Sequence, residues 1–142
     1  MRAWVGGLGR QLVASEPIPE RTEGVARIVI DCCYTVHKAL GPGLLENVYE
    51  LCMCHELSKR GLAFQRQVEC PVVYDGIRME SGFRLDLLVE NEVVVELKAV
   101  EATLPVHVAQ LLTYLKLSER RLGFLVNFNV PLIKEGIKRL AR

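Results

Sequence analysis

The chain has 142 residues, half of them hydrophobic and a quarter charged, with a formal net charge of +1. This length fits one domain with a substantial core, and the near-neutral charge argues against tight, non-specific binding to nucleic acid, although a local basic groove stays possible. No apolar run approaches the roughly 20 residues that span a bilayer. The start of the chain is too short and too interrupted by glycine for a secretory signal, so we expect a cytoplasmic protein.

The cysteines do not form a pattern typical of a disulfide framework or a zinc site. Their number is odd, and the C-C and C-x-C spacings lack the C-x-x-C arrangement with downstream partners that zinc sites use. We therefore expect these thiols to act as small core side chains. They are Cys32, Cys33, Cys52, Cys54 and Cys70.

Residues 1–20 contain several Gly and Pro without a steady period, which predicts a flexible tail ahead of one domain over residues 21–142. Apolar residues at spacings of three and four then predict a helix from Thr22 to Leu40. The Gly41-Pro42-Gly43 turn ends it. A second helix follows from about Leu44 to Arg60, and the short turn predicts that the two helices pack as neighbours.

The next segments have the composition of strands. An antiparallel meander is predicted, with an Asp75-Gly76 hairpin turn between its first two strands. A helix starting at Thr103, a fourth strand and a short last helix complete the order α-α-β-β-β-α-β-α, which predicts an α/β fold with one mixed sheet of about four strands and helices on both sides. The expected segments are strands over Ala63–Tyr74, Ile77–Val89, Val93–Val100 and Arg121–Asn127, and helices over Thr103–Ser118 and Ile133–Leu140.

Two charged residues interrupt the apolar strand at 93–100. Because strand side chains alternate between faces, Glu96 and Lys98 share one face. A charge inside such a strand is costly unless it is paired or binds a metal, and a simple Glu–Lys pair on a solvent-facing strand is the plain alternative. Asp86 favours the metal, because Asp is poor in strands and needs a reason to lie there.

The acidic pair makes a prediction about the turn. Asp86 lies opposite Glu96 only if Val89 pairs with Val93, which leaves residues 90–92 as a three-residue loop with Asn91 or a neighbour in the left-handed conformation. A regular two-residue turn would place Asp86 on the wrong face unless a bulge intervened, so we predict a three-residue loop or a bulge. If the register is right, the two carboxylates can share a hard cation such as Mg²⁺.

Asp86 followed by Glu96-Leu97-Lys98 resembles the signature of the PD-(D/E)xK nuclease superfamily, although Arg84-Leu85-Asp86 lacks the Pro-Asp of the name. Gly43-Leu44-Leu45-Glu46-Asn47-Val48-Tyr49 fits G-x-x-E-x-x-Y, the motif of the GxxExxY family, which looks like a compact branch of that superfamily. The resemblance covers roughly residues 22 to 142 and extends to His37–Gly43, Arg84–Glu101, Pro105–Leu115 and Asn127–Leu132.

The resemblance implies a restriction-endonuclease-like core that binds Mg²⁺ or Mn²⁺. Asp86 and Glu96 would hold the metal, with Glu46 as a third ligand that projects from its helix. Lys98 would orient the attacking water or stabilise the phosphate charge. Glu46 has an alternative role, because an exposed Glu near a helix N-terminus is favourable in itself. Gly43 belongs to the structural motif, and Tyr49 is expected to pack against the sheet and fix its helix.

The helix after the third strand carries further candidates. His107, Gln110 and Tyr114 form a polar stripe, opposite an expected buried side of Val108, Leu111, Leu112 and Leu115. Gln110 and Tyr114 fit Q-x-x-x-Y, which resembles a motif that supports the site and the strand in exonuclease-like members; simple helix-to-sheet bonding is the alternative.

Two kinds of basic side chain could contact phosphate. His37 and His107 could bind phosphate or be structural. Arg84 could reach a phosphate or pair with Glu96.

These features together predict a metal-dependent nuclease that hydrolyses phosphodiester bonds in DNA or RNA with a metal-activated water. The alternative is a non-catalytic module on the same fold that binds nucleic acid or a protein. Because a chain of this size offers little surface for gripping a duplex, a homodimer is also possible.

Overall fold

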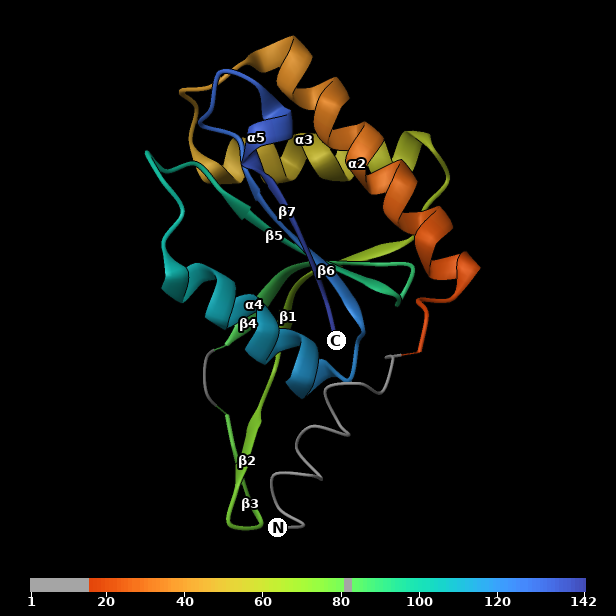
Figure 1. Cartoon of the computed structure of the whole chain (residues 1–142), viewed down its shortest axis with the longest axis vertical. Helices are drawn as coiled ribbons and strands as arrows, with labels where there is room; N and C mark the ends of the chain where they lie inside the picture. Colours follow the sequence, from red (N-terminus) through yellow and green to blue (C-terminus); the bar gives the residue numbers. More distant parts are fainter. Residues whose placement is uncertain (1–15, 81–82) are drawn as a thin grey trace, which may run out of the picture.

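A computed structural model describes residues 16–80 and 83–142 of the chain. Figure 1 shows a twisted central sheet with helices on both sides. The expected tail, residues 1–20, falls largely outside the described residues. The helices are α2 (Glu20–Leu40), α3 (Glu46–Lys59), α4 (Pro105–Ser118) and α5 (Ile133–Gly136), and the strands are β1 (Phe64–Glu69), β2 (Val72–Tyr74), β3 (Ile77–Met79), β4 (Arg84–Val89), β5 (Val93–Lys98), β6 (Leu122–Asn127) and β7 (Ile137–Ala141).

The main sheet has five strands in the order β1-β4-β5-β6-β7. The pairs β1–β4, β4–β5 and β6–β7 are antiparallel, whereas β5 and β6 are parallel and are joined through α4. A parallel pair needs such a crossover, because a tight turn cannot return the chain to the same end. The prediction of a mixed sheet flanked by helices is confirmed, with one strand more than the expected four.

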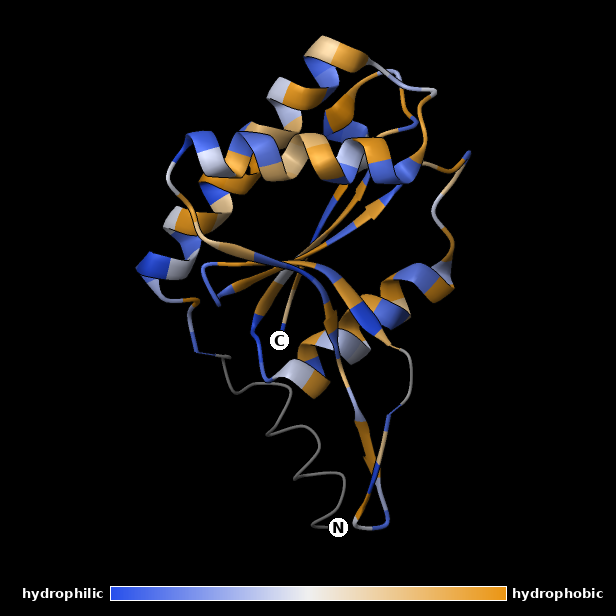
Figure 2. Ribbon diagram, turned by 180° about the vertical axis from the view of Figure 1, so that it is seen from behind, coloured by the Kyte–Doolittle hydropathy of each residue, from blue (hydrophilic) through white to orange (hydrophobic). Residues whose placement is uncertain are grey.

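Two apolar clusters fill the space between the sheet and its helices. On one face, α2 and α3 contribute residues such as Val29, Tyr49 and Leu57, which pack with Val95 and Leu97 of β5. On the other face, α4 packs over a second cluster that includes Leu111, Leu115 and Val94. Figure 2 shows hydrophobic colour along the central strands of the sheet. The strands read as near-continuous apolar runs because both faces of the sheet are covered.

The turn between α2 and α3 is fixed by Tyr49. Its ring is fully buried and stacks on Phe128 at a centroid distance of 4.5 Å, and its hydroxyl donates to the Gly41 carbonyl oxygen at 2.5 Å and accepts from the Leu44 N–H at 3.2 Å. Gly43 lies in this turn with φ +104°, a backbone conformation that favours glycine. The expected packing role of Tyr49 is confirmed.

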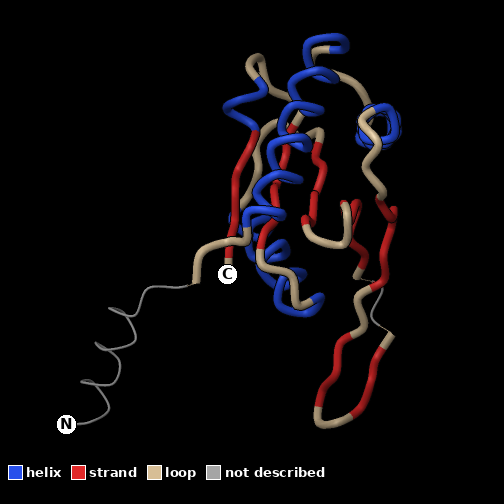
Figure 3. The backbone as a smooth tube through the Cα atoms, turned by 90° about the vertical axis from the view of Figure 1, so that its right-hand side faces the viewer, coloured by secondary structure: helices blue, strands red, loops and turns tan. Residues whose placement is uncertain are grey.

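Strands β2 and β3 form a separate two-stranded hairpin. Its turn is Asp75-Gly76, with positive φ at both residues, as a tight hairpin turn requires. Pro71 separates β2 from β1, so the single strand predicted over Ala63–Tyr74 is divided into two. Figures 1 and 3 show this hairpin projecting from the body of the domain.

The prediction of a last helix over Ile133–Leu140 is wrong beyond Gly136. The chain leaves α5 after one turn and continues as β7, which pairs antiparallel with β6. The physical reason is that the exposed side of β6 offers a full ladder of hydrogen-bonding groups, whose pairing outweighs a weak local preference for helix.

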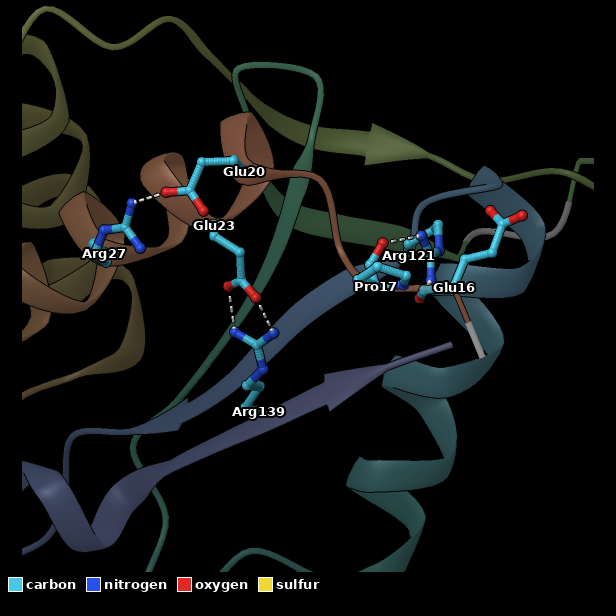
Figure 4. A network of polar contacts seen from close by, with 7 residues as sticks. All are labelled: Glu16, Pro17, Glu20, Glu23, Arg27, Arg121 and Arg139. Atoms are coloured by element: carbon cyan, nitrogen blue, oxygen red, sulfur yellow. Dashed lines mark hydrogen bonds and ion pairs between the residues drawn. The ribbon is translucent and has the colours of Figure 1, made fainter. Parts of the chain in front are cut away.

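Ion pairs connect the start of α2 to the β7 edge of the sheet. Both Arg139 Nη atoms lie 2.8 Å from the Glu23 carboxylate, and this hydrogen-bonded pair lowers the pKa of Glu23. Arg121 donates to the Glu16 and Pro17 carbonyl oxygens, and Arg27 pairs with Glu20 (Figure 4). Because these groups are exposed, their contribution to stability is small, and they mainly define how the chain enters the domain.

No disulfide joins the cysteines within the described part of the chain. Cys32 and Cys33 of α2 are fully buried in the core cluster that α2 and α3 share with the sheet, and burial raises the pKa of Cys32 to about 11. This agrees with their expected role as core side chains. Among the helices of the described residues, none is both long and apolar enough to cross a membrane.

Candidate functional site

The β4–β5 turn has the register that the acidic pair requires. Val89 pairs with Val93 and Leu88 with Val94, so residues 90–92 form a three-residue loop. Glu90 and Asn91 adopt left-handed φ angles of +51° and +57°. Of the two predicted solutions, a three-residue loop or a bulge, the structure has the loop, with Asn91 and its neighbour Glu90 both left-handed. Asp86 is thereby brought level with Glu96.

At the level of Asp86 and Glu96, side chains replace the backbone hydrogen bonds between β4 and β5. The ladder runs to Leu87 and Val95. Beyond it, the Asp86 N–H donates to Glu96 Oε1 at 2.9 Å, and the Leu97 N–H donates to Asp86 Oδ2 at 2.8 Å. Each carboxylate thus accepts a hydrogen bond from a backbone N–H of the opposite strand. The two acidic residues therefore lie at the same level of neighbouring strands, where the backbone ladder ends.

Asp86 also marks a break in the alternation along β4. Leu87 and Val89 pack in the cluster under α2 and α3, whereas Leu85 and Leu88 pack in the cluster under α4. A regular strand would place Leu85 on the same face as Leu87. The alternation of faces therefore breaks between these two leucines, at Asp86.

The charges of this pair are destabilised in the absence of a cation. Glu96 is only 7% exposed, and burial together with the neighbouring Asp86 charge raises its pKa to about 8. Burial, with smaller repulsion from Glu46 and Glu50, raises the pKa of Asp86 to about 6, against the Leu97 hydrogen bond and the Lys98 charge, which both lower it. A bound cation would remove this repulsion.

The donor set fits a hard divalent ion. Within residues 16–80 and 83–142, no group of three or more His, Cys, Asp or Glu side chains is gathered closely enough to hold a metal. Mg²⁺, however, is usually bound through one or two carboxylates, with waters and substrate phosphate completing its shell. Asp86 and Glu96 are two carboxylates that could hold such an ion.

Glu46 lies at the exposed first residue of α3. Its charge is close enough to raise the pKa of both Asp86 and Glu96. A role for Glu46 as a third metal ligand stays a prediction. One helical turn later, Glu50 is 6% exposed and directly contacts β1. Glu50 was not among the predicted site residues, although its i+4 spacing from Glu46 places both on one helix face.

Lys98 lies half-buried at the end of β5, two residues after Glu96. Its ammonium charge lowers the pKa of both acidic groups, so it lies on their side of the sheet. The α4 helix covers the same region. Tyr114 is buried on α4, its pKa is raised by burial and by the charges of Glu96 and Asp86, and its ring packs edge-on against Phe83.

The prediction of which α4 residues are buried is wrong at two positions. Leu112 was expected in the core but is 42% exposed, whereas Tyr114, expected on the polar stripe, is buried with Leu111 and Leu115. The reason is that Tyr114 fills the space beside Phe83 next to the acidic pair. Gln110 lies half-buried one turn before Tyr114. Its role in the site stays a prediction.

The remaining basic candidates have structural contacts. His107 Nδ1 accepts the Leu104 N–H at 2.9 Å and caps the start of α4, and His37 Nε2 lies 2.8 Å from the Val130 carbonyl oxygen. Arg84 is exposed and pairs with Glu69 at 3.5 Å, not with Glu96. These contacts account for the residues structurally, and phosphate binding by Arg84 or His107 stays a prediction.

The titration of the acidic pair predicts how stability depends on pH. Because the folded-state pKa of Glu96 is raised, the protonated group contributes stability that is full below its ordinary value of 4.5 and is lost as pH rises through about 8. We expect the unfolding temperature of the chain in chelator to fall more between about pH 6 and about pH 9 than that of Glu96→Gln. Thermal unfolding of both proteins checks this, and parallel curves would contradict it.

Comparison with known protein families gives a match. A family model described as the PD-(D/E)XK nuclease superfamily matches residues 23–140. This range contains every candidate site residue, from Gly43 before α3 to Tyr114 on α4. No curated protein and no solved structure gives a significant match to the chain.

Proposed function

Because the chain belongs to the PD-(D/E)XK nuclease superfamily, we propose that it hydrolyses phosphodiester bonds in nucleic acid, using Mg²⁺ or Mn²⁺ held by Asp86 and Glu96. The observation that carries the proposal is that both carboxylates lie at the end of the β4–β5 ladder, where each accepts a hydrogen bond from a backbone N–H of the opposite strand. Their raised pKa values support it, since burial destabilises both charges and the Asp86 charge adds repulsion at Glu96, which a bound cation would offset.

Each residue of the site has a role in the proposed reaction. A divalent cation, when bound, polarises the scissile phosphate and lowers the pKa of a bound water. Asp86 and Glu96 hold the charge that attracts it, and Glu46 adds negative charge from α3. Lys98 positions the attacking water or stabilises the negative charge that develops on the phosphate. Nothing in this scheme requires a covalent intermediate on the protein.

The α4 helix and Arg84 would contact the substrate. Tyr114 lies near enough to the acidic pair for both charges to raise its pKa, and Gln110 lies one turn before Tyr114 on the same helix. Arg84 is exposed at the start of β4, two residues before Asp86, where it can reach a phosphate next to the scissile one. His107 lies at the start of α4 and is the more remote candidate.

The finer assignments belong to the same proposal. We infer that the chain is a member of the GxxExxY branch, on the Gly43, Glu46 and Tyr49 motif, and that it acts in the cytoplasm. A homodimer would supply additional surface for a duplex, and light scattering tests it.

A cleavage assay tests the function directly. The full chain is incubated with single- and double-stranded DNA and RNA, with Mg²⁺, with Mn²⁺ or with chelator. We expect cleavage of at least one substrate that chelator abolishes. If no substrate is cut while one is bound equally well in chelator, the chain is instead a non-catalytic nucleic-acid-binding module on this fold.

A further inference from the structure

Gln67, on the edge strand β1, has an unusual backbone for a strand residue. Its φ is +51°, in the left-handed region, and the β1–β4 register passes from Arg66↔Leu87 to Val68↔Leu85 over Gln67 and Asp86. Few residues other than glycine adopt such angles, and those that do concentrate at functional sites. The break in β1 therefore lies directly beside the break at Asp86 in β4.

The break lets two consecutive residues reach the same carboxylate. Arg66 Nε and Nη2 lie 3.0 and 2.7 Å from Glu50 Oε2, and Gln67 Nε2 lies 2.9 Å from Glu50 Oε1. In a regular strand, neighbouring side chains point to opposite faces, so only one of them could contact Glu50. Arg66 alone already pairs the buried charge of Glu50. Gln67 must therefore contribute something else.

The second contact of Gln67 is with the acidic pair. The same Nε2 atom lies 3.5 Å from Asp86 Oδ1. Both partners of this amide are carboxylates, which only accept when ionised, so its NH₂ end faces them. The Leu97 N–H already holds Asp86 Oδ2 at 2.8 Å. Gln67 and Leu97 thus restrain the two oxygens of Asp86 from opposite sides.

We propose that Gln67 is a positioning residue, anchored by Glu50 and Arg66, that orients the Asp86 carboxylate for a divalent cation. The inference rests on the proposed function, because that function assigns the cation to Asp86. Groups that orient metal ligands through hydrogen bonds typically change metal affinity by 10- to 100-fold when they are removed.

The test is calorimetric titration of Mn²⁺ into the full chain and three variants. Gln67→Gly removes the amide but keeps the positive φ accessible, so the backbone can stay in place. Gln65→Gly is the matched control, because Gln65 is an exposed glutamine of the same strand that pairs with Leu88. Asp86→Asn tests the metal site itself. Thermal unfolding in chelator checks that every variant is folded.

We expect Gln67→Gly to weaken Mn²⁺ binding by about tenfold or more, with Gln65→Gly within about twofold of the unchanged chain. An unchanged Mn²⁺ affinity in Gln67→Gly, with binding lost in Asp86→Asn, would overturn the positioning role alone. If Asp86→Asn binds like the unchanged chain, or if the unchanged chain binds no Mn²⁺, the proposed metal site is wrong and the role of Gln67 falls with it.

Discussion

Replacing Glu96 by glutamine is expected to abolish Mn²⁺ binding and to reduce cleavage by about a thousandfold or more. Glutamine keeps the size of the side chain and an oxygen that can accept the Asp86 N–H, so the fold should persist. What is lost is the charge that holds the cation, and a metal supplies several kcal/mol of charge stabilisation to the transition state. Each 1.36 kcal/mol corresponds to about a factor of ten in rate.

The measurement is the cleavage rate on the best substrate over a range of Mn²⁺ concentrations, with binding followed by calorimetry. Glu101→Gln serves as the control, because Glu101 is an exposed carboxylate in the connection between β5 and α4. Full activity is expected there. Equal rates for Glu96→Gln and Glu101→Gln would place the chemistry elsewhere in the chain.

Replacing Gly136 by alanine is expected to reduce the free energy of unfolding by about 3 kcal/mol or more. A Cβ atom at this position would lie 2.1 Å from the Asn127 carbonyl oxygen and 3.0 Å from Val130 Cγ2. A backbone oxygen cannot rotate away as a side chain can, so α5 would have to move off the end of β6. Asn127 is itself fixed, because its side chain bonds both the N–H and the carbonyl of Val100.

Urea denaturation measures this change. The matched control is Gly24→Ala, because Gly24 lies in α2 and a Cβ there would meet only the Arg27 Nη2 atom, at 3.9 Å. Alanine in a helix costs less conformational entropy than glycine, so we expect a gain of roughly 0.5 to 1 kcal/mol in this variant. A Gly136→Ala protein as stable as the original would show that α5 can lie further from β6 than it does.

The local patterns in the sequence were sufficient for most of the fold. The apolar spacing of α2 and α3 and the Asp75-Gly76 turn were predictable because each depends on neighbouring residues. The register of the β4–β5 turn was predictable for another reason: the requirement that Asp86 lie level with Glu96 selects a three-residue loop. The pairing of Val89 with Val93 was thus predicted from the chemistry of the acidic pair more than from the propensities of the turn residues.

The end of the chain could not be predicted in the same way. Ile133–Leu140 has a local pattern compatible with a helix. Its second half forms a strand because it pairs with β6, which lies next to it in space. The close approach of Gly136 to Asn127 also joins residues nine apart through the bend between two strands. Such contacts depend on the assembled sheet and leave no periodic signal.

Within the site, the acidic pair and Lys98 were found from their cost in an apolar strand, and the structure brings Asp86 and Glu96 together. Glu50 had a signal, its i+4 spacing from Glu46, that was not used. Gln67 had none, because its positive φ and its contact with Asp86 arise only when β1 and β4 lie side by side.

Anomalous diffraction from crystals grown with Mn²⁺ tests the central claim most directly, because it locates the metal without depending on the choice of substrate. We expect one peak between the carboxylates of Asp86 and Glu96, within coordination distance of both. No peak at this position, or a peak at a different group of residues, would contradict a metal-dependent nuclease site at the end of the β4–β5 ladder.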